Sequence, residues 1–508
     1  MKVLGIELGS TRIKAVLINE NAEILATGVS DWENVLIDGL WSYPIEKVKS
    51  GMQEAYTDLI ASFGQPLTTV DHIGISGMMH GHLVTDENDN LLVPFRTWRN
   101  TNALRASEIL TPLFNFNVPM RWSVSQYFQA VLNGEEHVKK IAHVNTLSGY
   151  VHHILTGKRV LGMNDASGIF PLLGDDYDEK MLEKFDTLLS SYDISGSFKD
   201  LLPTVLCAGE NAGYLTEEGA KWLDPTGNLQ AGIPFCPPEG DMGTGLIATN
   251  CTAPLFGNIS SGTSANLTVV LDKPLKNYYK ELDVIATPDG HPAVIIHTNN
   301  CTNEINAWVN LFEENLALFG VKVSKVELFE KLFNHALNSD LKVGGMTGYN
   351  FLAGEPMAGT QTGAPMLIRG QDGVLNLANF MQTQIYSAIA TVAFGTDILE
   401  KEGIKLKSVL AHGGFYKTPF VGQNATSAIL KTPVTVMNTA SEGGAWGMAV
   451  LALYCLQEKQ TLATFLDKVF AKVEKTVVMA SEEEMQKRNA FFDNYKKFLP
   501  SQIVASES

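Results

Sequence analysis

The feature that most constrains the fold of this chain is a short pattern that occurs twice: a strand, a turn of glycine and two hydroxyl residues, and a second strand. Gly9-Ser10-Thr11 follows the apolar run 2–6, and Gly262-Thr263-Ser264 follows the strand-like run 254–260. An apolar run also comes directly after each turn. Because the two copies stand near the start of the two halves of a 508-residue chain, the sequence predicts two similar domains.

Strand-like and helix-like segments are interspersed in both halves, which predicts an α/β fold. We place the domains at 1–248 and 249–508. The first 30 residues predict an antiparallel meander whose third strand covers 24–26, and the end of the chain, 500–508, predicts a loose tail. The other main predicted elements are strands at 70–76, 82–85 and 293–297 and helices at 44–63, 303–318, 381–401 and 444–456.

The two glycine–hydroxyl turns are candidate phosphate loops. Glycine lets the backbone approach a ligand closely, and successive N–H groups and hydroxyls donate to phosphate oxygens. Either turn alone is more often an ordinary hairpin turn, but two in matching places favour phosphate binding. The chain has no GxxxxGK[ST], no GxGxxG that opens a helix and no HExxH, which argues against a P-loop enzyme, a dinucleotide-binding domain and a catalytic transition metal.

Asp241 is a candidate general base. It lies in PPEGDMGTG after the apolar run 231–236, and its small neighbours leave space for a bound hydroxyl. Phosphoryl transfer to an alcohol needs a carboxylate that accepts the proton of the attacking hydroxyl. The alternative is that Asp241 only caps a helix.

Two segments of the first half have the residue types of a sugar pocket. His80 stands next to Gly81 in GMMHGHLV, where a neutral imidazole suits hydrogen bonds to sugar hydroxyls. Trp98, Arg99 and Asn100 combine a flat apolar face with polar groups. The alternatives are a structural histidine and a surface loop that packs its tryptophan inward.

Two glycine-rich turns of the second half are candidates for contact with a nucleoside. His412-Gly413-Gly414 follows a β-rich run, and Glu442-Gly443-Gly444-Ala445 opens a helix rich in alanine and glycine. Taken alone, each is more often simple turn chemistry.

The net charge of −17 excludes large polyanionic partners. So acidic a surface repels nucleic acid and anionic membranes. An anionic small molecule such as ATP would have to be held by backbone amides and Mg²⁺. Charged residues make up only 18% of the chain, which indicates much buried surface between domains or subunits and is compatible with a homodimer.

The cysteines and the N-terminal segment predict a cytoplasmic protein. The five cysteines are scattered and have no CxxC spacing, which argues against a disulfide framework or a zinc site. The segment MKVLGIELGS enters a strand pattern at once and has no apolar core of a signal peptide. The longest weakly polar run, 443–456, is too short to cross a bilayer.

The order of the motifs resembles that of the FGGY carbohydrate kinases. Between residues 3 and 456 the chain contains GIELGSTRIK, SGMMHG, GMNDASG, EGDMGTG, SSGTSAN, LAGEP, AHGGF and EGGAWGMA in sequence. The resemblance implies the fold of the sugar kinase, Hsp70 and actin ATPases. In that fold two actin-like (ribonuclease H-like) domains, each a mixed sheet flanked by helices, enclose the active site in a cleft between them.

The resemblance also implies roles for particular residues. Asp241 would be the general base, and the Met-His-Gly of xylulokinases matches Met79, His80 and Gly81, whose histidine contacts the sugar. The acceptor in such enzymes is the terminal hydroxyl of a ketopentose. The residues that would bind ATP are Gly9, Ser10, Thr11, Lys14, Gly262, Thr263, Ser264, Gly413 and Gly414.

The chain departs from the family pattern at several positions. Glu7 stands where the family usually has Asp, so a carboxylate one methylene longer would hold Mg²⁺ or its waters. Met78 replaces the Gln of xylulokinases, and Arg99-Asn100 replaces Asn-Asp. Gln126 and Gln129 stand where the first family signature has Lys and Trp. These changes concern the choice of sugar more than the reaction.

The leading hypothesis is therefore ATP-dependent phosphorylation of a ketopentose, with D-xylulose slightly ahead of L-ribulose. Glycerol, gluconate, fuculose and rhamnulose are further substrates of this family. A sugar-sensing regulator or a chaperone-like ATPase would need an added DNA- or peptide-binding domain. A sugar-binding homologue that has lost catalysis is the third hypothesis, and it rests on Glu7.

Overall fold

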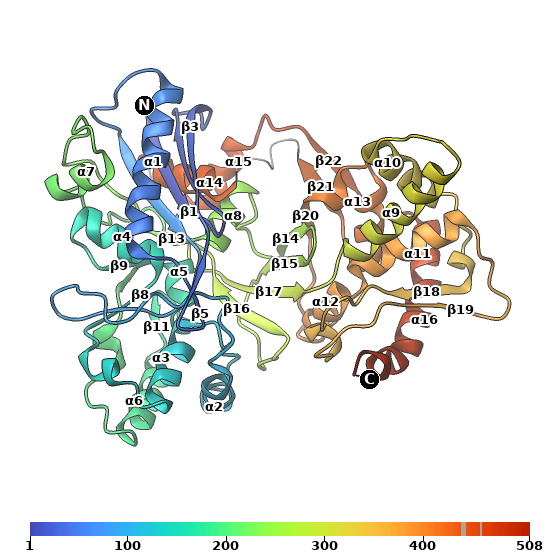
Figure 1. The fold of residues 1–508 in the computed structure, drawn as a ribbon, viewed down its shortest axis with the longest axis horizontal. Helices are drawn as coiled ribbons and strands as arrows, with labels where there is room; N and C mark the ends of the chain where they lie inside the picture. The colour runs from blue at the N-terminus through green and yellow to red at the C-terminus, as the bar shows by residue number, and fades with distance from the viewer. Residues whose placement is uncertain (438–442, 458–459, 508) are drawn as a thin grey trace.

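The computed structural model describes residues 1–437, 443–457 and 460–507, which form two α/β halves side by side (Figure 1). Glu442 of the EGGAWGMA motif lies outside the described residues. Each half has a mixed sheet flanked by helices, so the predicted fold class is confirmed. Within the described ranges no helix is long and apolar enough to cross a membrane.

The sheet of the first half begins with the predicted antiparallel meander β1–β2–β3. Strand β6 then pairs parallel to β1, and β13 pairs parallel to β6. The strand order across the sheet is β13 (Glu239–Gly240), β6 (His72–Gly77), β1 (Val3–Leu8), β2 (Arg12–Ile18) and β3 (Ile24–Asp31).

The sheet of the second half repeats this topology. Strands β14, β15 and β17 form an antiparallel meander, and β20 and β21 continue from β14 in parallel. The duplication that the turns predicted is thus present in the backbone pairing. The full strand order is β16 (Leu282–Ala286), β17 (Pro292–Thr298), β15 (Ala265–Val270), β14 (Phe256–Ser261), β20 (Ser408–His412), β21 (Val434–Met437) and β22 (Lys475–Val478).

Two helices of the second half complete the core of the first sheet. Helix α14 (Gly443–Tyr454) lies across β1, and Gly5 makes this approach possible because a Cβ there would stand 2.3 Å from the carbonyl oxygen of Ala445. Helix α15 (Leu462–Val469) adds Leu462, Phe465 and Leu466 to the same buried cluster. Figure 1 shows these red elements beside the blue strands.

The first half also carries a helical lobe, which packs its aromatic core against β16 and β17 through Ile285, Ala293 and Ile295. Its helices are α2 (Leu104–Phe114), α3 (Ser123–Leu132) and α6 (Glu179–Ser190). The other helices of this half are α1 (Ile45–Phe63), α4 (Leu147–Thr156), α5 (Met163–Ser167), α7 (Glu217–Leu223) and α8 (Asp241–Ala248). Its short strand pairs are β4 (Val35–Ile37) with β5 (Leu40–Ser42), β7 (Leu83–Thr85) with β8 (His143–Asn145), β9 (Val160–Gly162) with β12 (Thr204–Leu206), and β10 (Leu172–Leu173) with β11 (Asp176–Tyr177).

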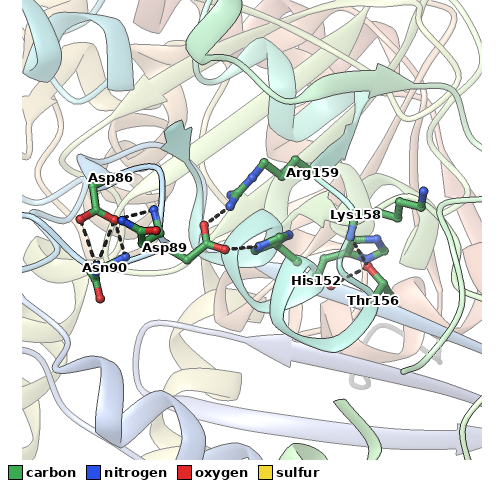
Figure 2. Close-up of polar contacts among 9 residues, drawn as sticks. Asp86, Asp89, Asn90, His152, Thr156, Lys158 and Arg159 are labelled. Atoms are coloured by element: carbon green, nitrogen blue, oxygen red, sulfur yellow. Dashed lines mark hydrogen bonds and ion pairs between the residues drawn. The ribbon is translucent and has the colours of Figure 1, made fainter. Parts of the chain in front are cut away.

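A polar cluster fastens the turn after β7 to helix α4 and the residues that follow it (Figure 2). Asp86 closes the turn by accepting from the backbone N–H of Asn90 at 2.9 Å. Asp89 accepts from His153 at 2.9 Å and forms an ion pair with Arg159. These contacts tie the turn after β7 to the last part of helix α4 and to the residues that follow it.

Helices cover the second sheet, and two predictions made there are wrong. The helix predicted over 381–401 is two helices, since α11 ends at Ala390 and α12 begins at Val392. The predicted loose tail is the last part of helix α16, in which Gln502 and Ser506 are buried. The helices are α9 (Asn303–Leu318), α10 (Lys325–Ala336), α11 (Leu377–Ala390), α12 (Val392–Lys401), α13 (Val421–Leu430) and α16 (Glu482–Glu507), and β18 (Met346–Tyr349) pairs with β19 (Met366–Arg369).

Candidate active site

Two adjoining cavities lie between the halves, and both have Asp241 in their walls. The larger has a volume of about 380 Å³ and includes Ser264, His412 and Gly443. The smaller has a volume of about 310 Å³ and lies on the side of the helical lobe. Three other residues line both cavities: Met242, Asn266 and His297.

Asp241 is the first residue of helix α8 and directly follows the short edge strand β13. Burial raises the pKa of its carboxyl group to about 6, although backbone N–H donors from Met242 and Met79 oppose the shift. A carboxylate with this pKa is ionised at neutral pH and still basic enough to take a proton. The Asp is therefore placed at the cleft with the chemistry of a general base.

Glu7 lies at the end of β1, where the N-terminus of α14 meets the cleft. The backbone N–H of Ala445 donates to its Oε2 at 3.2 Å. Burial and the nearby Asp241 carboxylate raise the pKa of Glu7 to about 7, against the opposite effects of that N–H and of Lys14. Two carboxyl groups that repel each other beside the candidate phosphate loop form a donor set that suits a hydrated Mg²⁺, which needs few protein ligands.

The first glycine–hydroxyl turn is held from outside by two aromatic side chains. Trp32 Nε1 donates to the Gly9 carbonyl at 2.7 Å, and the Tyr43 hydroxyl donates to the Ser10 carbonyl at 2.6 Å. Their rings lie 4.4 Å apart. With its carbonyls held on that side, the tip of the turn with Thr11 remains exposed to solvent.

The second turn is fixed by the segment that precedes α9. Thr302 donates through its hydroxyl to the Gly262 carbonyl at 2.7 Å, and the N–H of Cys301 donates to the Thr263 carbonyl at 2.9 Å. Ser264 lies in the wall of the larger cavity. Gly413 packs against β14. Its φ of 107° is one that other residues rarely adopt, and a Cβ there would lie only 2.3 Å from the Ser261 carbonyl oxygen, so the position requires glycine.

The smaller cavity brings together several of the predicted sugar-site residues, namely Met79, His80, Trp98 and Asp241. His80 is buried, with a left-handed φ of 69°, and its Nδ1 donates to the Gly168 carbonyl at 2.9 Å. Burial lowers the pKa of His80 to about 3. The imidazole is therefore neutral, and Nε2 is its acceptor.

Arg99 and Asn100 lie behind this cavity and contact the β4–β5 hairpin instead. Asn100 exchanges two hydrogen bonds with the backbone of Trp41, at 2.8 and 2.9 Å. The Arg99 guanidinium stacks on the Trp41 ring at 4.4 Å. Gly81 has a φ of 95° and donates to the Arg121 carbonyl at 3.3 Å, so it shapes the loop rather than the cavity wall.

Comparison with known proteins places the chain among sugar kinases. The model for the FGGY family of carbohydrate kinases, N-terminal domain, matches residues 2–248, and the model for its C-terminal domain matches 257–456. The chain belongs to the FGGY family. It is an ATP-dependent carbohydrate kinase.

The relatives of this FGGY kinase are distant. It is 22% identical to the xylulose kinase of Haemophilus influenzae over 89% of this chain and 90% of that protein. It is also 22% identical to the gluconokinase of Bacillus subtilis, over 99% of this chain and 97% of the relative. The ligand-bound xylulose kinase of Lactobacillus acidophilus has the same fold, with a TM-score of 0.81 at 17% identity over 100% of this chain and 99% of that one.

The sequence of the FGGY kinase did not indicate five residues that line the smaller cavity: Arg121, Met242, Asn266, Ile295 and His297. Arg121 forms an ion pair with Asp283 of β16, so it also joins the two halves. Asn266 stands two residues after Ser264 of the second glycine–hydroxyl loop, and this closeness to the loop is the only local signal for it. Neither Arg121 nor His297 stands in a motif, because only the packing of the two halves brings them to the cleft.

Two further carboxyl groups of the kinase lie buried near Asp241. Asp165 accepts from the hydroxyls of Thr146 and Ser148, and burial raises its pKa to about 7. Glu239 accepts from the backbone N–H of Asp165 at 3.2 Å, and burial raises its pKa well above the ordinary value. Both groups are harder to ionise than Asp241, so Asp241 is the carboxylate of this region best suited to act as a base.

Proposed function

We propose that this kinase transfers the γ-phosphoryl group of ATP to the terminal hydroxyl of a ketopentose, with Asp241 as the general base. D-xylulose is slightly favoured over L-ribulose. The observation that carries the proposal is that Asp241 lines both cavities at once. A group at that place can reach a sugar hydroxyl on one side while a nucleotide phosphate lies on the other.

The reaction needs little from the protein beyond position and charge. Asp241 accepts the proton of the sugar hydroxyl while the oxygen bonds to the γ-phosphorus. The bond from that phosphorus to the bridging oxygen of ADP breaks in the same displacement, and ADP leaves with the electron pair. The pKa of about 6 keeps Asp241 ionised and ready at neutral pH.

ATP would be held by the two glycine–hydroxyl loops. The first supplies Gly9, Ser10 and Thr11, with Lys14 on the strand that follows, and Glu7 would hold Mg²⁺ directly or through its waters. The second loop supplies Gly262, Thr263 and Ser264 to the phosphates, and Gly413 and Gly414 would contact the adenosine. Mg²⁺, when bound, neutralises charge on the transferred phosphates.

The sugar would lie in the smaller cavity. The neutral His80 accepts a hydrogen bond from a sugar hydroxyl through Nε2, and Trp98 offers a flat face to the ring or chain. Met79 closes the wall. Gly81, Arg99 and Asn100 would act by shaping the loops around the cavity, since their contacts are with Arg121 and Trp41.

The preference for xylulose rests on Met79-His80-Gly81 and on the names of the relatives. A gluconokinase is among those relatives, so a sugar acid is the second candidate acceptor, and Arg121 in the cavity wall favours it. We further propose that the kinase acts in the cytoplasm, binds no nucleic acid and forms a homodimer, with the domain boundary between 248 and 249.

The test is the substitution Asp241→Asn, with ADP release measured over a panel of pentuloses, hexuloses, polyols and sugar acids. We expect sugar phosphorylation to fall by at least about 1,000-fold while the Kd for ATP stays within about threefold. Asp224→Asn is the control, because Asp224 is an even more buried aspartate whose hydrogen bonds only fasten the loop of Thr226 and Leu229. Equal loss of ATP binding and turnover would make Asp241 a structural residue or a metal ligand.

A further inference from the structure

Asn164 joins the helix that carries Asp241 to the second half of the molecule. It is fully buried in helix α5. Its Oδ1 accepts from the backbone N–H of Gly243, in the first turn of α8, at 2.9 Å. Its Nδ2 donates to the carbonyl oxygen of Ala286, the last residue of β16, at 2.7 Å. One side chain thus bridges α8 and β16.

Glycines on both sides of Asp241 make this contact close. A Cβ at Gly243 would lie 2.7 Å from Asn164 Cγ, and a Cβ at Gly240 would lie 2.6 Å from Asn164 Oδ1. Any side chain at either position would push the amide away. The backbone just before and just after Asp241 therefore rests directly on Asn164.

Ser167 makes the link to β16 twofold. Its hydroxyl donates to the Asn164 carbonyl at 2.6 Å and accepts from the N–H of Ala286 at 3.0 Å. Both backbone polar groups of Ala286 are therefore bound to α5. A shift of β16 relative to the first half would have to carry α5 with it or break these hydrogen bonds. Breaking them is costly in free energy, because it leaves buried polar groups without partners.

We infer that Asn164 is a positioning residue for phosphoryl transfer. It holds the first turn of α8, and with it the Asp241 carboxylate, in a fixed position relative to β16. The inference rests on the proposed role of Asp241 as base. A displacement of about 1 Å at a reacting group costs on the order of 100-fold in rate. The Asn164 side chain hydrogen-bonds to Gly243 and Ala286, and neither residue belongs to a glycine–hydroxyl loop, so ATP affinity should not depend on Asn164.

The test is Asn164→Ala in steady-state kinetics with the best sugar of the panel. We expect kcat to fall about 10- to 100-fold while KM for ATP stays within about twofold. Ser167→Ala keeps the bond to Gly243 and loses only the contacts of the Ser167 hydroxyl, so a smaller fall of about two- to tenfold is expected. Asn379→Ala is the matched control, because Asn379 is equally buried but holds only Asp340 and Val374 in the second half. It should lower Tm and leave kcat unchanged.

Two results would overturn the inference. One is an Asn164→Ala protein with lowered Tm and unchanged kcat, as in the control. The other is a KM for ATP that rises as much as kcat falls. If Asn164→Ala does not fold, Ser167→Ala decides, and an unchanged kcat there overturns the inference. Asp241→Asn in the same assay separates the two proposals: retained activity contradicts the base, whereas its loss beside a normal kcat in Asn164→Ala contradicts only the positioning role.

Discussion

Asp241 differs in its pKa from the other buried carboxyl groups around it. Glu7 and Asp165 have pKa values raised to about 7, and the pKa of Glu239 is raised well above its ordinary value, all mainly by burial. Asp241, at about 6, is the first of the four to lose its proton as pH rises. When their surroundings give neighbouring titratable groups different pKa values, one group can act as a base while another stays protonated as an acid or a structural partner.

The pKa of Asp241 predicts the acid limb of the pH–rate profile. The ordinary pKa of an aspartate is near 4, so the raised value means that the base is protonated, and inactive, at a higher pH than usual. We expect kcat/KM for the sugar to fall about tenfold per pH unit below about pH 6. The profile is measured from pH 5 to 8 at saturating ATP. A profile that stays flat down to pH 5 would argue against Asp241 as the base.

At the scale of elements, the contact between β1 and α14 joins segments more than 400 positions apart. The sequence predicted both elements, yet nothing in either one indicated that they touch. Gly5 is the reason they can, because its missing Cβ leaves space for the backbone of Ala445 and Ala449. The same helix brings the N–H that binds Glu7.

Gly5→Ala should therefore destabilise the whole protein. The new methyl would lie 2.3 Å from the Ala445 carbonyl oxygen and 2.4 Å from the Ala449 nitrogen, and neither backbone can move without shifting α14. We expect a loss of about 1–3 kcal/mol or more in the free energy of unfolding, measured by urea titration. Gly370→Ala is the control, since its nearest non-bonded neighbour would be 3.8 Å away. Equal stabilities would show that α14 adjusts freely.

The end of α16 is a second element whose burial can be tested. Gln502 donates to the Ala364 carbonyl at 2.7 Å and to the Ser506 hydroxyl at 2.9 Å. Gln502→Ala would leave that carbonyl without its side-chain donor, so we predict a loss of about 1–3 kcal/mol. Val504→Ala, at a side chain 69% exposed, should change the stability by less than about 0.5 kcal/mol. Stability is measured by thermal unfolding. If both variants lose the same small amount of stability, the end of α16 is frayed in solution.

At the scale of the whole molecule, the two halves are joined on both sides of the cleft. Helix α14 lies on the first sheet, while the helical lobe holds β16 through the Arg121–Asp283 ion pair and through Asn117, which donates to the Leu282 carbonyl at 3.0 Å. Any movement of the halves about the cavities around Asp241 must keep these contacts or break them.

We predict that the halves close when sugar and nucleotide bind together. Water must be kept from the γ-phosphate, and cleft closure is the usual means. Small-angle X-ray scattering should show a smaller radius of gyration with the sugar and a non-hydrolysable ATP analogue than with either ligand alone. An unchanged radius in the ternary complex would contradict closure, and the ligand-free protein in the same buffer is the control.

The local pattern was sufficient for much of the fold. Helix α9 begins and ends where its apolar spacing predicted, and the duplicated turns correctly indicated two sheets of the same topology. The predictions failed where local signals compete with packing. The break at Thr391 has no glycine or proline beside it, and the polar end of α16 has the composition of a free tail, although it hydrogen-bonds to Ala364 and Thr362 in the folded chain.

The sequence by itself determined the antiparallel meander of the first 30 residues, the two glycine–hydroxyl turns and the position of Asp241 after an apolar run, because each depends on neighbours along the chain. Only the tertiary structure decided which side chains face the cleft. Arg121 and His297 reach it, Arg99 and Asn100 turn to Trp41, and Asn164 bridges two halves. Such contacts depend on how elements far apart in the sequence pack together, and the local spacing of residues does not show which elements will meet.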